Sequence, residues 1–78
     1  MVNILVVDDE KSMRRTLSIA LQDDGYEVME AANGKEALEY INNEVFDIVI
    51  TDLVMDDIDG IELLRNIKEV NPITEVLL

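Results

Sequence analysis

The sequence predicts a three-layer α/β/α fold built on a parallel β-sheet, and three observations support this. Apolar residues alternate along the chain between the period of a strand and the period of a helix, in the order β-α-β-α-β-α-β. The connections between these segments are short, which favours right-handed crossovers between parallel strands. Residues 48–50 are β-branched and apolar on both faces, as is typical of a central strand covered by helices on each side. The 78 residues suffice for one small domain.

The first half of the chain contains two strands and two helices. A strand is expected over about residues 3–7, followed by a helix that ends at Gly25, a residue suited to a left-handed helix cap. A second strand covers residues 26–31, and Asn33 and Gly34 then precede a short second helix. Each helix is recognised by apolar positions that share one face: Met13, Leu17, Ala20 and Leu21 in the first, and Ala37, Leu38 and Ile41 in the second.

The second half of the chain repeats this alternation. A third strand is expected over residues 46–51, and Asp59 is suited to cap a third helix. Asn71 and Pro72 end that helix, and residues 74–78 begin a fourth strand. The expected buried stripe of the third helix is Ile61, Leu64 and Ile67.

Composition restricts the possible functions. Six Lys and Arg against 18 Asp and Glu give a net charge of -12, so this segment should repel nucleic acid and anionic membranes and favour partners with basic surfaces. The chain has no cysteine and no histidine, so any metal is expected to be held by oxygen. No apolar run approaches the roughly 18 to 20 residues that span a bilayer, and Met1 leads directly into a strand pattern rather than a signal peptide. A cytoplasmic location is therefore expected.

Acidic residues follow two of the predicted strands. Asp8 and Asp9 follow the first strand, and Asp52 follows the third. A flavodoxin-like strand order of 2-1-3-4 makes these strands neighbours, and ligands in such sheets bind beyond the carboxyl ends of the strands where the order reverses. Three carboxylates gathered there repel one another unless a cation, a proton or a function compensates. Mg²⁺ accepts carboxylates and phosphate oxygens, and an aspartate can act as a nucleophile, so the pattern suggests phosphoryl transfer onto a carboxylate.

Several of these residues also have structural interpretations. Asp8 or Asp9 alone is more often a helix cap than a metal ligand, and it is Asp52 on the third strand that favours the metal interpretation. Arg14 and Arg15 are interpreted as solvent-facing residues of the first helix.

Three stretches of the chain resemble the receiver domain of two-component response regulators. They are residues 4–10 (ILVVDDE), residues 33–37 (NGKEA) and residues 47–55 (DIVITDLVM), the last followed by Asp59 and Gly60. These elements have the order and spacing of that family over the whole chain, so the resemblance implies the same flavodoxin-like fold.

The resemblance also implies a role for each acidic residue of the pocket. Asp52 would be the phosphoacceptor. Asp9 and Asp52 would bind Mg²⁺ directly together with the backbone carbonyl of Val54, while Asp8 would contribute mainly through water. The phosphoryl donor would be a histidine kinase or a phosphotransfer protein, so the chain would be a signalling domain rather than an enzyme.

Two features differ from the family pattern. Asp56 stands where the family usually has proline after the position of Met55, which adds charge near the pocket. The chain also stops in the predicted fourth strand, so the final strand and last two helices of the family are absent, with the Ser or Thr and the Lys that engage the phosphoryl group. Residues 1–78 are therefore expected to be the N-terminal portion of a receiver domain.

Two alternative functions remain open at the level of the sequence. A truncated receiver scaffold would keep the acidic pocket, fold or self-associate, and perform no phosphotransfer. Because its fourth strand is an exposed edge, the 78-residue chain is itself expected to form either a closed homodimer, which we favour, or open-ended aggregates. A hydrolase of the haloacid dehalogenase type would use an aspartyl intermediate, but it needs Asp-x-Asp after the first strand, where this chain has adjacent Asp8 and Asp9.

Overall fold

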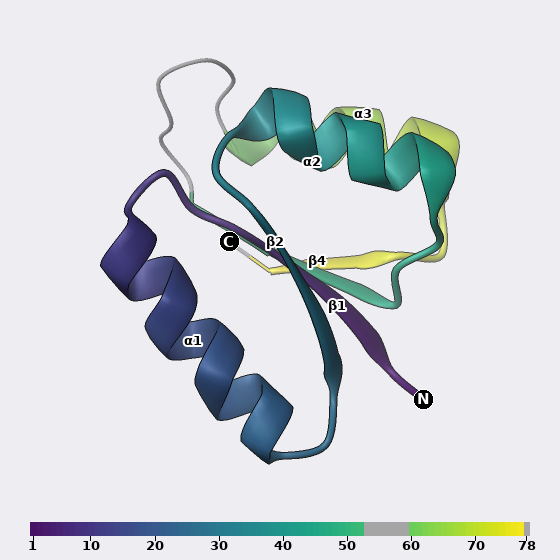
Figure 1. Cartoon of the computed structure of the whole chain (residues 1–78). Coiled ribbons are helices and arrows are strands. Elements are labelled where there is room, and N and C mark those ends of the chain that lie inside the picture. The colour runs from purple at the N-terminus through teal and green to yellow at the C-terminus, as the bar shows by residue number, and fades with distance from the viewer. Residues whose placement is uncertain (53–59, 78) are drawn as a thin grey trace.

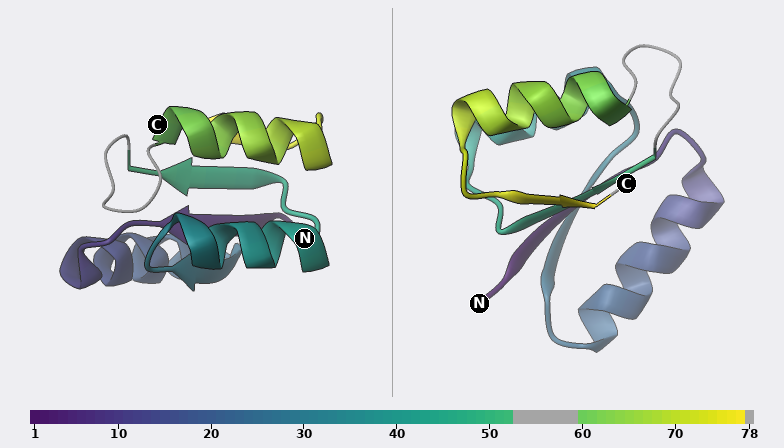
Figure 2. Two further views of the ribbon diagram at one scale, coloured as in Figure 1. Left: turned by 90° about the horizontal axis from the view of Figure 1, so that it is seen from above. Right: turned by 180° about the vertical axis from the view of Figure 1, so that it is seen from behind.

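The computed structural model describes residues 1–52 and 60–77. The sheet forms a middle layer, with α1 on one face and with α2 and α3 on the other (Figures 1 and 2). The predicted three-layer α/β fold is confirmed. The elements in chain order are β1 (Asn3–Val7), α1 (Lys11–Asp23), β2 (Glu27–Ala31), α2 (Gly34–Asn43), β3 (Ile48–Thr51), α3 (Gly60–Val70) and β4 (Glu75–Leu77).

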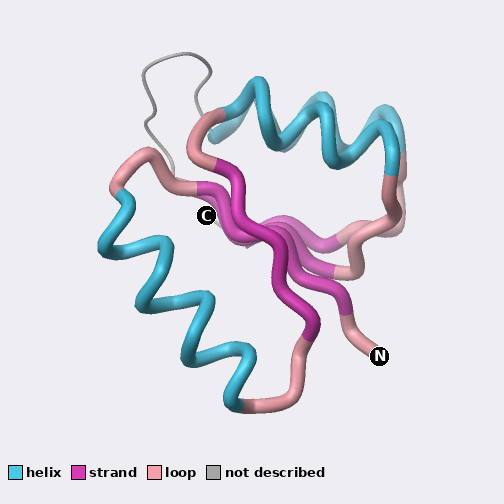
Figure 3. The backbone as a smooth tube through the Cα atoms, in the orientation of Figure 1, coloured by secondary structure: helices cyan, strands magenta, loops and turns pink. Residues whose placement is uncertain are grey.

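All four strands are parallel and lie in the order β2-β1-β3-β4, shown in magenta in Figure 3. In the centre of the sheet, Ile4 of β1 pairs with Val28 on one side and with Ile48 on the other. Just before the first of these pairs, the backbone N–H of Asn3 donates to Oδ2 of Asp47 at 2.8 Å, which joins residues 44 positions apart. The flavodoxin-like order is therefore confirmed, and β1 and β3 are neighbours as predicted.

The main core lies between the sheet and the layer formed by α2 and α3. Alternate residues of β1 point into it, because successive side chains of a strand face opposite sides of the sheet. Ile4 and Val6 of the same strand are buried as well, toward the face that α1 covers. The buried residues of the main core are Leu5, Val7, Ala31, Ala37, Ile41, Phe46, Val49, Leu63 and Ile67.

Local signals in the sequence set the helix ends. Gly25, two residues after the end of α1, has a φ angle of 94°, in the left-handed region that glycine tolerates best. Asn33 caps α2 because its side-chain oxygen accepts a hydrogen bond from the backbone N–H of Glu36 at 2.9 Å. Gly25 and Asn33, both predicted from the sequence to mark helix boundaries, therefore lie at the end of α1 and at the start of α2.

The buried faces of two helices differ from the prediction. In α1, Met13 is 59% exposed and Ala20 is also exposed, whereas Ser18, which no apolar pattern selects, is fully buried. In α3, Ile61 is 48% exposed and Leu63 is fully buried. Apolar residues on adjacent helical positions allow more than one face to be chosen, and the packing against the sheet and the neighbouring helix decides between them.

The strands are slightly shorter than predicted. β2 begins at Glu27 rather than at residue 26, β3 begins at Ile48 rather than at residue 46, and β4 begins at Glu75 rather than at residue 74. The expected cap Asp59 and the terminal Leu78 lie outside the described residues. Within residues 1–52 and 60–77, none of the helices has both the length and the apolar character that crossing a membrane requires.

Candidate functional site

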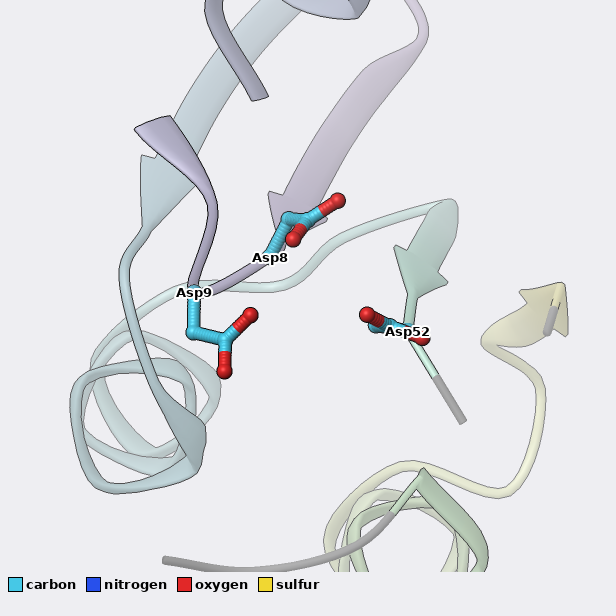
Figure 4. Close-up of side chains that lie close together, drawn as sticks. All are labelled: Asp8, Asp9 and Asp52. Carbon is cyan, nitrogen blue, oxygen red and sulfur yellow. The ribbon is translucent and has the colours of Figure 1, made fainter. Parts of the chain in front are cut away.

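Three carboxylates meet at the carboxyl edge of the sheet. Asp8, Asp9 and Asp52 each offer an oxygen, and these three oxygens lie within 4.8 Å of one another (Figure 4). Asp9 and Asp52 are exposed, and Asp8 is half-buried. The cluster predicted from two strand ends is thus present in the folded chain.

The sheet itself positions the backbone of two of these residues. The N–H of Asp8 donates to the carbonyl of Ala31 at the end of β2, at 3.1 Å, and the N–H of Asp52 donates to the carbonyl of Val7 at the end of β1, also at 3.1 Å. The hydrogen-bond ladder therefore continues one residue beyond β1 and β3. The backbone of both aspartates is consequently held by the sheet and does not belong to an independent loop.

The helix-cap interpretation of Asp8 and Asp9 is wrong. Glu10 occupies the cap position of α1, and its side chain makes no capping hydrogen bond. The side chain of Asp8 instead accepts a hydrogen bond from the backbone N–H of Glu10, from N to Oδ1, at 2.9 Å. This local turn holds the Asp8 carboxylate beside its own backbone.

Arg14 is not a solvent-facing residue, contrary to the prediction. Its Nη1 donates to the backbone carbonyl of Asp8 at 2.8 Å, and its Nε donates to Oε1 of Glu30 on β2 at 3.1 Å. The neighbouring Arg15 also pairs with Glu30, but it is more exposed. Sequence reasoning missed this bridge, for which the only available signal was a lone acidic residue near the end of the predicted second strand.

The chemistry of the cluster suits a hard cation. Carboxylate oxygens are the ligands that Mg²⁺ prefers, and two exposed carboxylates leave space for the water molecules that this ion retains. The remaining predicted ligand, the carbonyl of Val54, lies outside the described residues.

A groove of about 510 Å³ opens beside the cluster. Its polar lining consists of the acidic residues Asp8, Glu10 and Asp52 and of the buried Thr51. The remaining lining is apolar and comes from the sheet and α1: Val6, Val7, Met13, Leu17 and Ile50. A second cavity, of about 370 Å³, includes Asn3 and Phe46 near the amino ends of the strands and none of the predicted site residues.

The sequence profile of the response regulator receiver domain matches residues 4–78. The chain belongs to the response regulator receiver family. It is 47% identical over 77 residues to the transcriptional regulatory protein ZraR of Klebsiella oxytoca, covering 99% of this chain and 17% of that protein. It is 40% identical over 77 residues to the response regulator receiver protein CpdR of Brucella abortus (strain 2308), covering 99% of this chain and 64% of that protein. The chain thus spans less than two thirds of the length of either relative.

Solved receiver structures have the same fold. The response regulator protein TrrA from Thermotoga maritima, in complex with Mg²⁺-BeF, superposes with a TM-score of 0.94 at 40% identity, over 100% of this chain and 68% of that one. The chemotaxis protein CheY4 of Vibrio cholerae superposes with a TM-score of 0.92 at 37% identity, over 97% of this chain and 65% of that one. This receiver chain therefore shares both sequence and architecture with known response regulators.

Proposed function

We propose that this receiver chain is the phosphoacceptor module of a two-component phosphorelay. In this proposal Asp52 accepts a phosphoryl group from a histidine kinase or a phosphotransfer protein, and Mg²⁺ assists the transfer. The observation that carries the proposal is the gathering of Asp8, Asp9 and Asp52 at the carboxyl edge of a receiver sheet. The relative solved in complex with Mg²⁺-BeF supports it, because that complex contains the proposed cation.

Asp52 is the proposed nucleophile because it directly follows the central strand β3 and is exposed. In the transfer, a carboxylate oxygen of Asp52 attacks the phosphorus of the donor's phosphohistidine, and the P–N bond breaks. The leaving imidazole nitrogen keeps the electron pair of that bond and takes up a proton. The product is an aspartyl phosphate, so the chain is modified once by each transfer rather than turning over as an enzyme.

The proposed metal ligands are the carboxylates of Asp9 and Asp52 and the backbone carbonyl of Val54, with Asp8 acting mainly through water. When bound, Mg²⁺ neutralises charge on the transferring group and on the three carboxylates. The residues of the chain supply the rest: the sheet holds Asp8 and Asp52 by backbone hydrogen bonds, and the turn at Glu10 holds the Asp8 carboxylate. The acidic charge of the chain, -12 in total, also favours a partner with a basic docking surface.

The proposal also covers the extent of the domain, its location in the cell and the partners that it does not bind. Residues 1–78 are proposed to be the N-terminal portion of a receiver domain, located in the cytoplasm, and this segment is proposed to bind neither nucleic acid nor membrane directly. The share of the solved receivers that the chain covers, 65% for CheY4, supports the first part.

Asparagine at position 52 tests the phosphoacceptor. The protein is incubated with acetyl phosphate and Mg²⁺, and its intact mass is measured. We expect a phosphate adduct on the unchanged protein and none on Asp52→Asn, which loses the nucleophile but keeps the side-chain shape. Asp47→Asn is the matched control, because Asp47 is an exposed aspartate at the opposite end of β3. An undiminished adduct on Asp52→Asn would overturn the assignment.

A further inference from the structure

Arg14 joins three parts of the fold with one side chain. It belongs to α1, it contacts the carbonyl of Asp8 in the turn after β1, and it contacts the carboxylate of Glu30 on β2. Its side chain is only 13% exposed, against 53% for the adjacent Arg15. The guanidinium is therefore held among protein groups, where its hydrogen bonds are weakened little by solvent.

The carbonyl that Arg14 contacts controls the geometry of two proposed site residues. The peptide unit between Asp8 and Asp9 is planar, so the oxygen of Asp8 and both Cα atoms lie in one plane. A donor that holds this oxygen therefore restricts the ψ angle of Asp8 and the φ angle of Asp9, and with them the directions in which the two side chains leave the backbone. The preceding peptide is fixed separately by the hydrogen bond from the N–H of Asp8 to Ala31.

Glu30 in turn fixes the guanidinium. An arginine side chain has several rotatable bonds, and a contact to a single carbonyl would leave much of this freedom. Oε1 of Glu30 accepts from Nε of Arg14 at 3.1 Å, while Oε2 of Glu30 accepts from Arg15. Glu30 directly precedes Ala31, whose carbonyl holds the N–H of Asp8. The end of β2 therefore holds the N–H of Asp8 directly, and it holds the carbonyl of Asp8 indirectly, through Arg14 of α1.

We propose that Arg14 is a positioning residue for cation binding, which sets the peptide between Asp8 and Asp9 so that both carboxylates face the metal. This inference rests on the proposed function, because it assumes that the acidic cluster binds Mg²⁺. It differs from that function in assigning a role to a residue outside the cluster that touches neither metal nor phosphoryl group.

Charge alone predicts the opposite result, which makes the inference testable. Removing an arginine takes away a positive charge near a cation site, so electrostatics by itself should tighten Mg²⁺ binding. Loss of positioning should weaken it instead. Groups that orient metal ligands typically change affinity about 10- to 100-fold when they are replaced.

The test measures Mg²⁺ affinity by isothermal titration calorimetry at constant ionic strength, and folding by circular dichroism without metal. For Arg14→Ala we expect at least a roughly tenfold loss of affinity with the fold retained. Arg14→Lys should not restore it, because one ammonium group cannot reproduce the fork that reaches both Asp8 and Glu30. Arg15→Ala is the matched control: it removes the same charge and one contact to Glu30, but it leaves the contact to Asp8, so affinity should be unchanged or slightly tighter.

The outcomes separate this inference from the proposed function. If the unchanged protein shows no saturable Mg²⁺ binding, the proposed function fails and the inference with it. If the unchanged protein binds Mg²⁺ and a folded Arg14→Ala protein binds equally or more tightly, the inference alone is overturned. Should Arg14→Ala not fold, Mg²⁺ affinity is measured instead for Arg14→Gln, for Glu30→Gln and for the variant that carries both substitutions. The inference requires each single substitution to weaken Mg²⁺ binding. It also requires the double variant to bind Mg²⁺ no more weakly than Arg14→Gln does.

Discussion

The hydroxyl of Thr74 donates a hydrogen bond to the backbone carbonyl of Phe46 at 2.7 Å, and both residues are buried. This bond joins the segment before β4 to the segment before β3, across 28 positions of sequence. It joins the amino ends of β3 and β4, whereas the acidic cluster lies at the carboxyl ends of the strands.

Replacing this hydroxyl should destabilise the fold. Thr74→Val keeps the shape of the side chain but removes the donor, so the buried carbonyl of Phe46 loses this partner. We expect the free energy of unfolding to fall by about 1 to 3 kcal/mol. Urea unfolding followed by circular dichroism measures the change, with Thr16→Val on the exposed surface of α1 as the control. Equal effects of the two substitutions would contradict the role of the hydrogen bond.

Alanine at two positions of α3 tests which face of that helix is buried. Leu63 is fully buried in the main core, whereas Ile61 is 48% exposed. Leu63→Ala should lower the free energy of unfolding by about 2 to 5 kcal/mol, because it removes buried methyl groups and leaves a cavity. Ile61→Ala should cost far less. If the larger loss followed Ile61→Ala, the buried stripe would be the one predicted from the apolar pattern.

Mg²⁺ should stabilise the folded chain. A ligand that binds the native state alone adds stability by mass action, about 1.4 kcal/mol at ten times its dissociation constant. Thermal unfolding with MgCl₂, compared with NaCl of the same ionic strength, measures the specific part. Asp9→Ala should lose most of it, and Mn²⁺ should act like Mg²⁺ on the unchanged chain. An identical shift in both proteins would indicate general screening of the net charge of -12.

The isolated 78-residue polypeptide should self-associate. Leu77 on the last described strand is 52% exposed, and the groove beside α1 has an apolar lining that includes Met13 and Leu17. A second copy that covers these surfaces would form the dimer favoured by the sequence. Because like charges oppose association, the dimer fraction should rise with salt concentration. Light scattering on a sizing column measures it, and Leu77→Lys should weaken the dimer more than Val45→Lys on a distant loop. A monomer at all salt and micromolar protein concentrations would contradict the prediction.

The strand positions could be predicted from the sequence because they depend on strong local signals, and the strand order follows from the flavodoxin-like fold that the alternation of strands and helices indicates. Runs of β-branched residues identify the central strands. Because β1 and β3 are parallel neighbours, Asp8, Asp9 and Asp52 meet at their carboxyl ends, where ligands bind in sheets of this kind. These signals do not depend on fine details of packing.

The bridge through Arg14 could not be predicted in the same way. It depends on the angle at which α1 crosses the end of β2, and that angle comes from tertiary packing rather than from any periodic pattern. The same limit explains the errors for Met13 and Ile61: a helix with apolar residues on neighbouring positions has several possible inner faces, and only the surface against which it packs selects one.

The pairing of β1 with β3 has a consequence for the speed of folding. Asn3 and Asp47, which are joined at the start of this pair, lie 44 positions apart, so a long loop must close before the two strands meet. Asp52 approaches Asp8 and Asp9 only after that closure, and a cation that needs all three carboxylates has no complete site in the earlier, partly folded chain. Bound Mg²⁺ should therefore leave the refolding rate almost unchanged and slow unfolding, so the cation would stabilise the chain kinetically only after the sheet has formed.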